Sequence, residues 1–418
     1  MRVLQGNTFL RQNAVFFAGS VVIGATNYLY YPVLGRLLDP IAFGDVQALM
    51  AMYMQLALLL TVLSQVSVNV AANYQDESKR LATLFELEKL AFVLSLGLVV
   101  LLAALSWKLR NFLQLSSVWP LLILLATLLL SVPPTFRSAY LRAHMAFGHA
   151  SVTGIIGSAG KVLMSALLVM IGYKAQGAIA GVAIAQFISF LYAAYFARKL
   201  GFKQPANNSY FVRLDMATLA PELRYAGLVL VCSLAITVLA SADILVAKHY
   251  FSPQVAGEYA GISTVAKIIF YLTGSMAQVM LPAVKIHNSA QENRQLLTKS
   301  LIILTAVGGS STLVFALFNR VVVGTLMGSE YLPFAGVLPS LAAAMFVISV
   351  INMLVIYHVA LRRYQVGLVM LGATALTCVL LFVSHDTPAH MVNSLLYGSV
   401  LSLGGISIWH YLAFAKAK

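Results

Sequence analysis

Charged residues are scarce in this chain of 418 residues. They make up 10% of the sequence, whereas hydrophobic residues make up 60% and the mean hydropathy is +0.87. A soluble protein of this length could not cover its surface with so few charges. Apolar runs recur that are long enough to cross about 30 Å of hydrocarbon, at roughly 1.5 Å per residue of helix. The sequence therefore predicts an all-α polytopic membrane protein.

Cysteines and acids are also few. Cys232 and Cys378 both lie in apolar segments, which argues against a disulfide framework and against a cysteine metal site. Most of the 13 Asp and Glu residues lie in loops or at expected helix ends. The chain has no His-Glu zinc signature, no phosphate loop and no Ser/His/Asp arrangement. We therefore expect no enzyme, no catalytic residue, no metal and no cofactor, and leave coupling to H⁺ or Na⁺ open.

The formal net charge of +14 could suggest a nucleic-acid partner. Cytoplasmic loops of membrane proteins are rich in Lys and Arg, so topology explains this charge better. With the N-terminus inside, 19 of the 27 Lys and Arg residues fall in inside segments and six in outside segments. This asymmetry predicts that both termini are cytoplasmic and that no nucleic acid is bound.

The apolar segments form two sets of six. The first set falls at about 13–35, 45–72, 82–106, 119–140, 150–171 and 177–197, and the second at about 221–248, 257–281, 300–318, 333–360, 365–384 and 391–413. We therefore predict about twelve spans, with an N-terminal lobe over residues 1–205 and a C-terminal lobe over 206–418. Proline removes a backbone donor, so Pro133 and Pro134 should interrupt the fourth span. Pro333 and Pro339 should distort the start of the tenth.

Two segments echo each other, Arg36–Leu49 and Lys248–Ile262. Each reaches Pro after a short polar side chain and then, four residues later, Gly followed by an acid. The matching residues are Asp39, Pro40, Gly44 and Asp45 in the first, and Ser252, Pro253, Gly257 and Glu258 in the second. The pattern predicts a turn and a capped helix start. The two prolines lie 213 residues apart, which indicates an internal duplication of two parallel six-helix halves related by a pseudo-twofold axis along the membrane normal.

Two lysines are predicted to lie near mid-membrane. Lys161 lies well inside the fifth span and Lys267 well inside the eighth. Placing a Lys there costs about 2.5 to 3.5 kcal/mol on insertion scales. Asp243, the best acidic partner, is expected toward the outer end of its own span. We therefore interpret both lysines as cations that await an anion carried by the substrate, the alternative being pairing with an acid or extension toward a membrane surface.

Uncharged polar residues predict a cavity around these lysines. They are Asn27, Gln55, Gln65, Asn69 and Gln278, and the alternative for each is a hydrogen bond between helices.

A second set of charges gathers at the outer ends of the first, second, seventh and eighth spans. It consists of Arg36, Asp45, Asp243, Lys248 and Glu258. We interpret this set as an outer gate whose ion pairs cross between the two halves; the alternative is local capping and surface pairing.

The segments Tyr31–Gly44 (YPVLGRLLDPIAFG) and Asp243–Gly261 (DILVAKHYFSPQVAGEYAG) resemble matching patterns in Wzx-type polysaccharide flippases. These belong to the multidrug/oligosaccharidyl-lipid/polysaccharide exporter (MOP) superfamily. The resemblance implies two bundles in a V shape, alternating access, and an oligosaccharide on undecaprenyl pyrophosphate as substrate. It also implies the bacterial inner membrane, contact with membrane lipids, and possible partners in a polysaccharide polymerase and a chain-length regulator.

Three alternatives remain open on sequence grounds. A multidrug antiporter of the same superfamily would want a carboxylate at mid-depth in the first half, and none is present there. A major-facilitator transporter usually carries an Asp-Arg loop between its second and third helices, where this chain has NYQDESKR. A non-transporting partner of a glycan-assembly complex would have little use for mid-membrane lysines.

Overall fold

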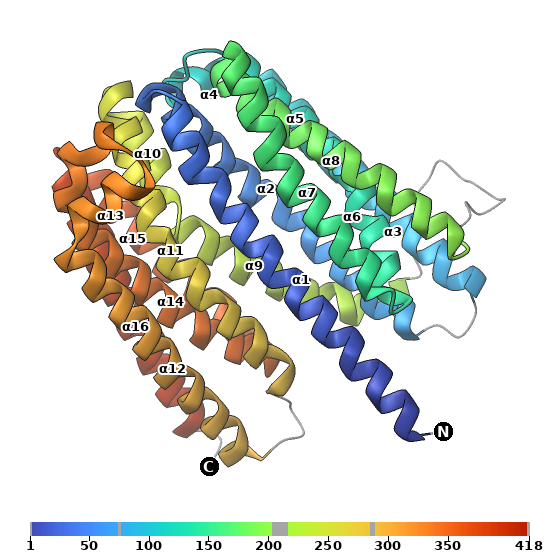
Figure 1. The fold of residues 1–418 in the computed structure, drawn as a ribbon. Coiled ribbons are helices and arrows are strands. Elements are labelled where there is room, and N and C mark those ends of the chain that lie inside the picture. The colour runs from blue at the N-terminus through green and yellow to red at the C-terminus, as the bar shows by residue number, and fades with distance from the viewer. Residues whose placement is uncertain (1, 74–76, 203–215, 285–288, 416–418) are drawn as a thin grey trace. The chain divides into compact units, whose positions relative to one another are not determined.

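The computed structural model describes residues 2–73, 77–202, 216–284 and 289–415, and these contain no strand (Figure 1). The α-helices are α1 (Arg2–Leu37), α2 (Pro40–Asn73), α3 (Glu77–Ala104), α4 (Ser106–Phe112), α5 (Trp119–Leu130), α6 (Val132–Ala143), α7 (Phe147–Leu168), α8 (Lys174–Lys199), α9 (Met216–Leu239), α10 (Ala242–Tyr250), α11 (Pro253–Ala283), α12 (Ala290–Leu317), α13 (Asn319–Leu326), α14 (Leu338–Ala360), α15 (Gln365–Val383) and α16 (Pro388–Ala415). A π-helical turn, Val169–Tyr173, and a 3-10 segment, Ser329–Val337, complete the helical elements.

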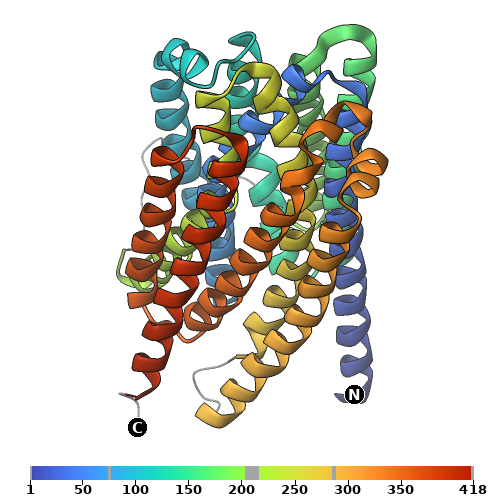
Figure 2. The same ribbon diagram turned by 90° about the vertical axis from the view of Figure 1, so that its left-hand side faces the viewer.

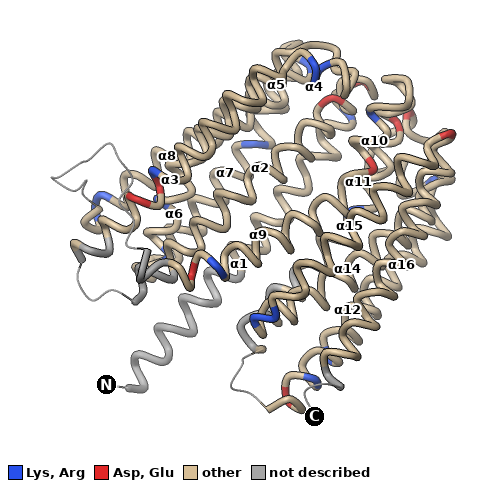
Figure 3. Tube along the Cα trace, turned by 180° about the vertical axis from the view of Figure 1, so that it is seen from behind, with Lys and Arg blue, Asp and Glu red and all other residues tan. Residues whose placement is uncertain are grey.

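Ten stretches of the described residues are long and apolar enough to cross a membrane. One of them, Phe147–Lys199, contains both α7 and α8. Counting these two helices separately and adding the 36-residue α1 gives the predicted twelve spans. Figure 3 shows charged residues gathered toward helix ends, with long uncharged stretches between them. The prediction of an all-α polytopic protein is confirmed.

The chain divides into two compact units. Unit 1 contains residues 1–38 and 52–226, and unit 2 contains residues 39–51 and 227–418. The first three turns of α2, up to Ala51, thus belong to the unit that holds most of the C-terminal half. The predicted lobe boundary between residues 205 and 206 lies outside the described residues.

Unit 1 is built around α7 and α8, which pack along each other, with α1 against α7 and α5 and α6 against α8. At one end of this unit an apolar cluster includes Leu84, Tyr140 and Phe202. Next to it, Arg137 donates to the Glu88 carboxylate at 2.6 Å and lies over the Phe202 ring at 4.1 Å. Both side chains are only 15% exposed, so each charge has lost most of its contact with solvent. Each therefore depends on the opposite charge of its partner for compensation.

Unit 2 is built around α14, which packs against α11, α12 and α16. Helices α15 and α16 also pack along each other (Figure 2). The long apolar side chains of α14 fill this core: Leu341, Met345 and Ile348 are fully buried. Helix α11, which carries Lys267, therefore packs against the well-buried helix α14.

Both echoed turns start helices as predicted. Helix α2 begins at Pro40, and the Asp39 carboxylate accepts a hydrogen bond from the Ala42 N–H at 2.8 Å. Helix α11 begins at Pro253, and the Ser252 hydroxyl oxygen accepts from the Val255 N–H at 3.5 Å. These oxygens satisfy backbone donors that a helix start leaves without a partner.

The predicted breaks are also confirmed, and one further break was missed. The fourth span splits at Ser131 into α5 and α6, just before the two prolines, and a 3-10 segment precedes α14. The segment predicted as one apolar run over 221–248 instead divides into α9 and α10. At this break the Ser241 hydroxyl donates to the Thr237 carbonyl at 2.6 Å, a local bond that competes with continued helix.

Candidate functional site

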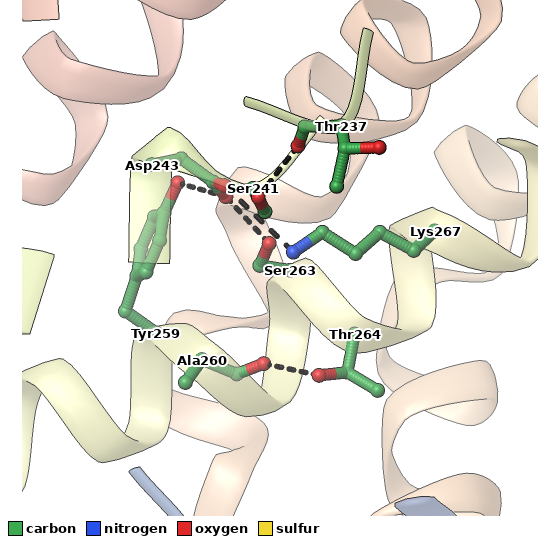
Figure 4. Close-up of polar contacts among 8 residues, drawn as sticks. All are labelled: Thr237, Ser241, Asp243, Tyr259, Ala260, Ser263, Thr264 and Lys267. Atoms are coloured by element: carbon green, nitrogen blue, oxygen red, sulfur yellow. Dashed lines mark hydrogen bonds and ion pairs between the residues drawn. The ribbon is translucent and has the colours of Figure 1, made fainter. Parts of the chain in front are cut away.

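Lys267 lies near the middle of the 31-residue α11, in a network of buried polar side chains (Figure 4). Its ammonium group is 3.8 Å from Oδ1 of Asp243, which lies in the first turn of α10. The other carboxylate oxygen, Oδ2, accepts hydrogen bonds from the Tyr259 hydroxyl at 3.0 Å and the Ser263 hydroxyl at 2.5 Å. Asp243 is fully buried and Lys267 is 7% exposed. The carboxylate thus receives two hydroxyl donors and one cation.

This geometry corrects one step of the sequence interpretation. Lys267 was expected to lack an acidic partner, and that expectation is wrong. The break between α9 and α10 lies just before Asp243, and the first turn of α10 brings the carboxylate to the lysine on α11. The positive charge of Lys267 is therefore already balanced inside unit 2.

The helix α10 carries a second buried ion pair. The Lys248 ammonium lies 2.6 Å from Oδ1 of Asp45 on α2, and both side chains are only 1% exposed. Close contact between α2 and α11 surrounds this pair: a Cβ added at Gly257 would overlap the Pro40 carbonyl oxygen, and one added at Gly44 would meet Gly257 at 2.8 Å. The two echoed glycines thus pack against each other.

The predicted outer gate is therefore divided by the structure. Asp45 and Lys248 pair, and Asp243 pairs with Lys267 instead. Glu258 is half-buried and accepts a hydrogen bond from Gln254 on its own helix at 2.5 Å. Arg36 is exposed and belongs to unit 1. The predicted gate has ion pairs that cross between the two halves of the protein, whereas Asp45 and Lys248 lie in the same unit. This contact therefore does not test a gate, and the gate role of the pair stays a prediction.

Lys161 has a different environment, in unit 1. Its ammonium lies 4.5 Å from the centre of the Tyr30 ring and 5.9 Å from that of Tyr31, both on α1. Tyr30 is fully buried, and its hydroxyl donates to the Ala178 carbonyl at 3.3 Å, so the ring is held in place. No ion pair to Lys161 is recorded among the described residues. Aromatic faces attract a cation without using its N–H donors.

The predicted cavity residues differ in their exposure. Asn27 and Gln55 are half-buried and Gln65 is exposed. The side chains of Asn69 and Gln278 lie outside the described residues. Their assignment to a substrate cavity stays a prediction. No group of three or more His, Cys, Asp or Glu side chains that could hold a metal ion occurs among the described residues.

Sequence reasoning missed two members of the Lys267 network, Tyr259 and Ser263. A signal for them was present, because residues 259, 263 and 267 are spaced four apart and therefore share one face of a helix. A polar stripe of this kind on an apolar helix indicates that the stripe faces a polar partner inside the protein. Tyr30, whose ring lies against Lys161, was also not among the predicted site residues.

The fold is that of a polytopic helical membrane protein with charged side chains buried between its helices. Solved structures show the same fold. An inward-facing multidrug resistance MATE family transporter of the MOP superfamily matches with a TM-score of 0.77 at 13% identity, covering 94% of this chain and 95% of that one. The lipid II flippase MurJ in an inward closed conformation matches with a TM-score of 0.73 at 12% identity, covering 95% and 87%.

A MOP superfamily transporter from Pyrococcus furiosus, described as having a binding pocket of reverse polarity, matches with a TM-score of 0.56 at 12% identity, covering 96% and 93%. Curated protein sequences give no match. The family of polysaccharide biosynthesis proteins matches residues 10–285, about two thirds of the chain. The chain belongs to this family. The two structures with the higher TM-scores are those of a transporter and a flippase.

Proposed function

We propose that this protein is a flippase that moves an oligosaccharide linked to undecaprenyl pyrophosphate from the cytoplasmic to the outer leaflet by alternating access. The cargo would be a repeat unit of O-antigen, capsule or exopolysaccharide. Two findings support this proposal: the family is one of polysaccharide biosynthesis, and one similar structure is that of a flippase for a lipid-linked substrate.

The single observation that carries the proposal is the environment of Lys161. An ammonium group in the membrane interior is costly unless something compensates its charge. The Tyr30 face compensates it in part, at about 0.5 to 2 kcal/mol for a contact of this type. Lys267, by contrast, has the Asp243 carboxylate beside it. Of the two lysines, Lys161 is therefore the one whose charge is better placed to meet a pyrophosphate.

The resemblance to bacterial polysaccharide flippases supports a location in the bacterial inner membrane. The distribution of charge supports an orientation with both termini in the cytoplasm, because Lys and Arg concentrate in the segments that this orientation puts inside. Its partners would be the lipid-linked substrate, the membrane lipids and, in the assembly pathway, a polysaccharide polymerase and a chain-length regulator.

Drug export is the competing function, since multidrug transporters share this fold. A carrier of cationic drugs needs an acid that is available to the drug. Among the described side chains of unit 1 no carboxylate is buried. Of the buried acids in unit 2, Asp45 is paired with Lys248, and Asp243 is engaged by Lys267. These contacts favour an anionic cargo.

Deletion of the gene tests the proposal. We expect lipid-linked oligosaccharide to accumulate on the cytoplasmic face, where it is labelled by a lectin in inverted vesicles and not on intact spheroplasts. A plasmid copy of the gene should restore surface glycan. If the lipid-linked oligosaccharide of the deletion strain is accessible from outside at wild-type levels, the flippase function is wrong.

A further inference from the structure

A groove of about 560 Å³ lies at one end of unit 1, between α1, α7 and α8. Its lining includes Gly19 and Val22 of α1, Gly148, His149 and Ser151 of α7, and Tyr192 of α8. Its volume falls within the range of about 300 to 1,000 Å³ that is usual for small-ligand sites. It lies at the start of α7, away from Lys161, which is 14 residues further along that helix.

The groove surrounds a helix N-terminus that no side chain caps. Ala146 is the N-cap residue of α7 and makes no side-chain cap hydrogen bond. Gly148 and His149 follow it within the first turn, where backbone N–H groups have no partner inside the helix. A 22-residue helix such as α7 also directs the positive end of its dipole at this point. Such a terminus binds phosphate and carboxylate groups.

A second, independent observation indicates a ligand. Ser151, one turn into α7, is 4% exposed, and its hydroxyl has no hydrogen-bond partner among the described residues. Opposite it, Gly19 leaves α1 so close that a Cβ there would lie 2.6 Å from the Ser151 oxygen. Nearby, His149 Nδ1 and the Tyr192 hydroxyl are hydrogen-bonded at 3.1 Å. A buried hydroxyl without a partner is costly, and a polar ligand in the groove would satisfy it.

The rest of the groove is apolar. Val22 is 45% exposed and Val152 is 38% exposed, so hydrocarbon wall continues from the groove onto the outer side of these two helices. A ligand that fits must therefore carry an anion at one end and an apolar chain at the other. The positive helix end matches the anion in charge, and the imidazole and the two hydroxyl groups match it in hydrogen bonding.

We propose that this groove binds the phosphate end of the isoprenoid carrier, with the first part of its chain along Val22 and Val152, before the cargo reaches Lys161. This inference rests on the proposed function, which supplies a polyprenyl pyrophosphate substrate. The predicted topology places the start of α7 on the cytoplasmic side, where the substrate is made. The groove is thus a loading site, separate from Lys161.

Photocrosslinking of the purified full-length protein in nanodiscs tests this inference. The probe is a sugar-free polyprenyl pyrophosphate with a diazirine on its first isoprene unit, and the crosslinked peptides are mapped by mass spectrometry. Gly148→Leu fills the groove, and the structure shows open space around the added Cβ. Gly97→Leu on α3 is the matched control, because Gly97 also has open space and does not line the groove. Ser151→Ala removes the hydroxyl alone.

We expect the wild-type protein and Gly97→Leu to be labelled on α1 and on the first turns of α7. Gly148→Leu should lose this labelling. Ser151→Ala should bind the probe about tenfold more weakly, as is usual for the loss of a hydrogen bond to a charged group. Excess phosphatidylglycerol should not compete, whereas unlabelled polyprenyl pyrophosphate should.

Three results would overturn the inference, and they separate it from the proposed function. Labelling elsewhere in the protein that Gly148→Leu leaves unchanged would remove the groove and leave the flippase function intact. Equal competition by phosphatidylglycerol would make the groove a site for bulk lipid. If the probe labels no part of the protein, the proposed substrate class is wrong together with the groove.

Discussion

The buried ion pair between Asp45 and Lys248 gives a sharp prediction about stability. Replacing Lys248 with Met keeps the length of the side chain and removes its charge. The Asp45 carboxylate, 1% exposed, would then be left in the interior of unit 2 without its cation at 2.6 Å. Removing one partner of such a buried pair costs about 3 to 5 kcal/mol.

Two controls separate the lost charge from a general effect of mutation. In the double variant Asp45→Asn with Lys248→Met no charge is left unpaired, so most of the lost stability should return. The pair between Lys89 and Glu86 is more exposed, at 25% and 17%, and lies on one helix. Lys89→Met should therefore cost no more than about 0.5 kcal/mol.

Thermal unfolding of the detergent-solubilised variants measures this difference. A domain of 150 to 250 residues loses about 2 to 4 °C of midpoint per kcal/mol, so Lys248→Met should unfold on the order of 10 °C below the wild type. A midpoint within about 2 °C of that of Lys89→Met would refute the reasoning. It would favour an exposed, opening gate over a fixed contact between the start of α2 and α10.

Two other predictions concern the second buried pair and the topology. Lys267→Met should lower the amount of folded protein, and adding Asp243→Asn should restore it, because the double variant buries no unpaired charge; immunoblots of solubilised membranes measure this, and no rescue would contradict a charge-balancing role for the pair. In a cysteine-free version, Asn207→Cys should react with a membrane-impermeant maleimide only after lysis, whereas Lys174→Cys should react on intact spheroplasts. Reaction of position 207 from outside would invert the topology.

Much of the fold could be predicted from the sequence, because its signals are local. The capped starts at Pro40 and Pro253 require only a short polar side chain and a proline with the right φ. The break at Ser131 follows from the two prolines after it. The duplication could be recognised because both echoed turns have the same number of residues between the proline and the glycine–acid pair.

The candidate site could be predicted only in part, because its partners depend on where helices end in three dimensions. The contact of Lys267 with Asp243 requires the break after Leu239, and the apolar run across residues 221–248 gave no sign of that break. The division of α2 at Ala51 was also hidden, because the helix continues through it without a change in composition. Apolar periodicity specifies that a helix is buried, and it does not specify which helix covers it.

Glycan export in cells that carry variants of Lys161 tests the central claim most directly. Surface glycan should be measured in the deletion strain complemented with Lys161→Ala, Lys161→Arg or the exposed control Lys299→Ala, at equal amounts of protein in the membrane. The account predicts that Lys161→Ala abolishes export, that Lys161→Arg keeps part of it because the charge remains, and that Lys299→Ala exports normally. Near-normal export by Lys161→Ala would contradict the claim that this lysine meets the pyrophosphate.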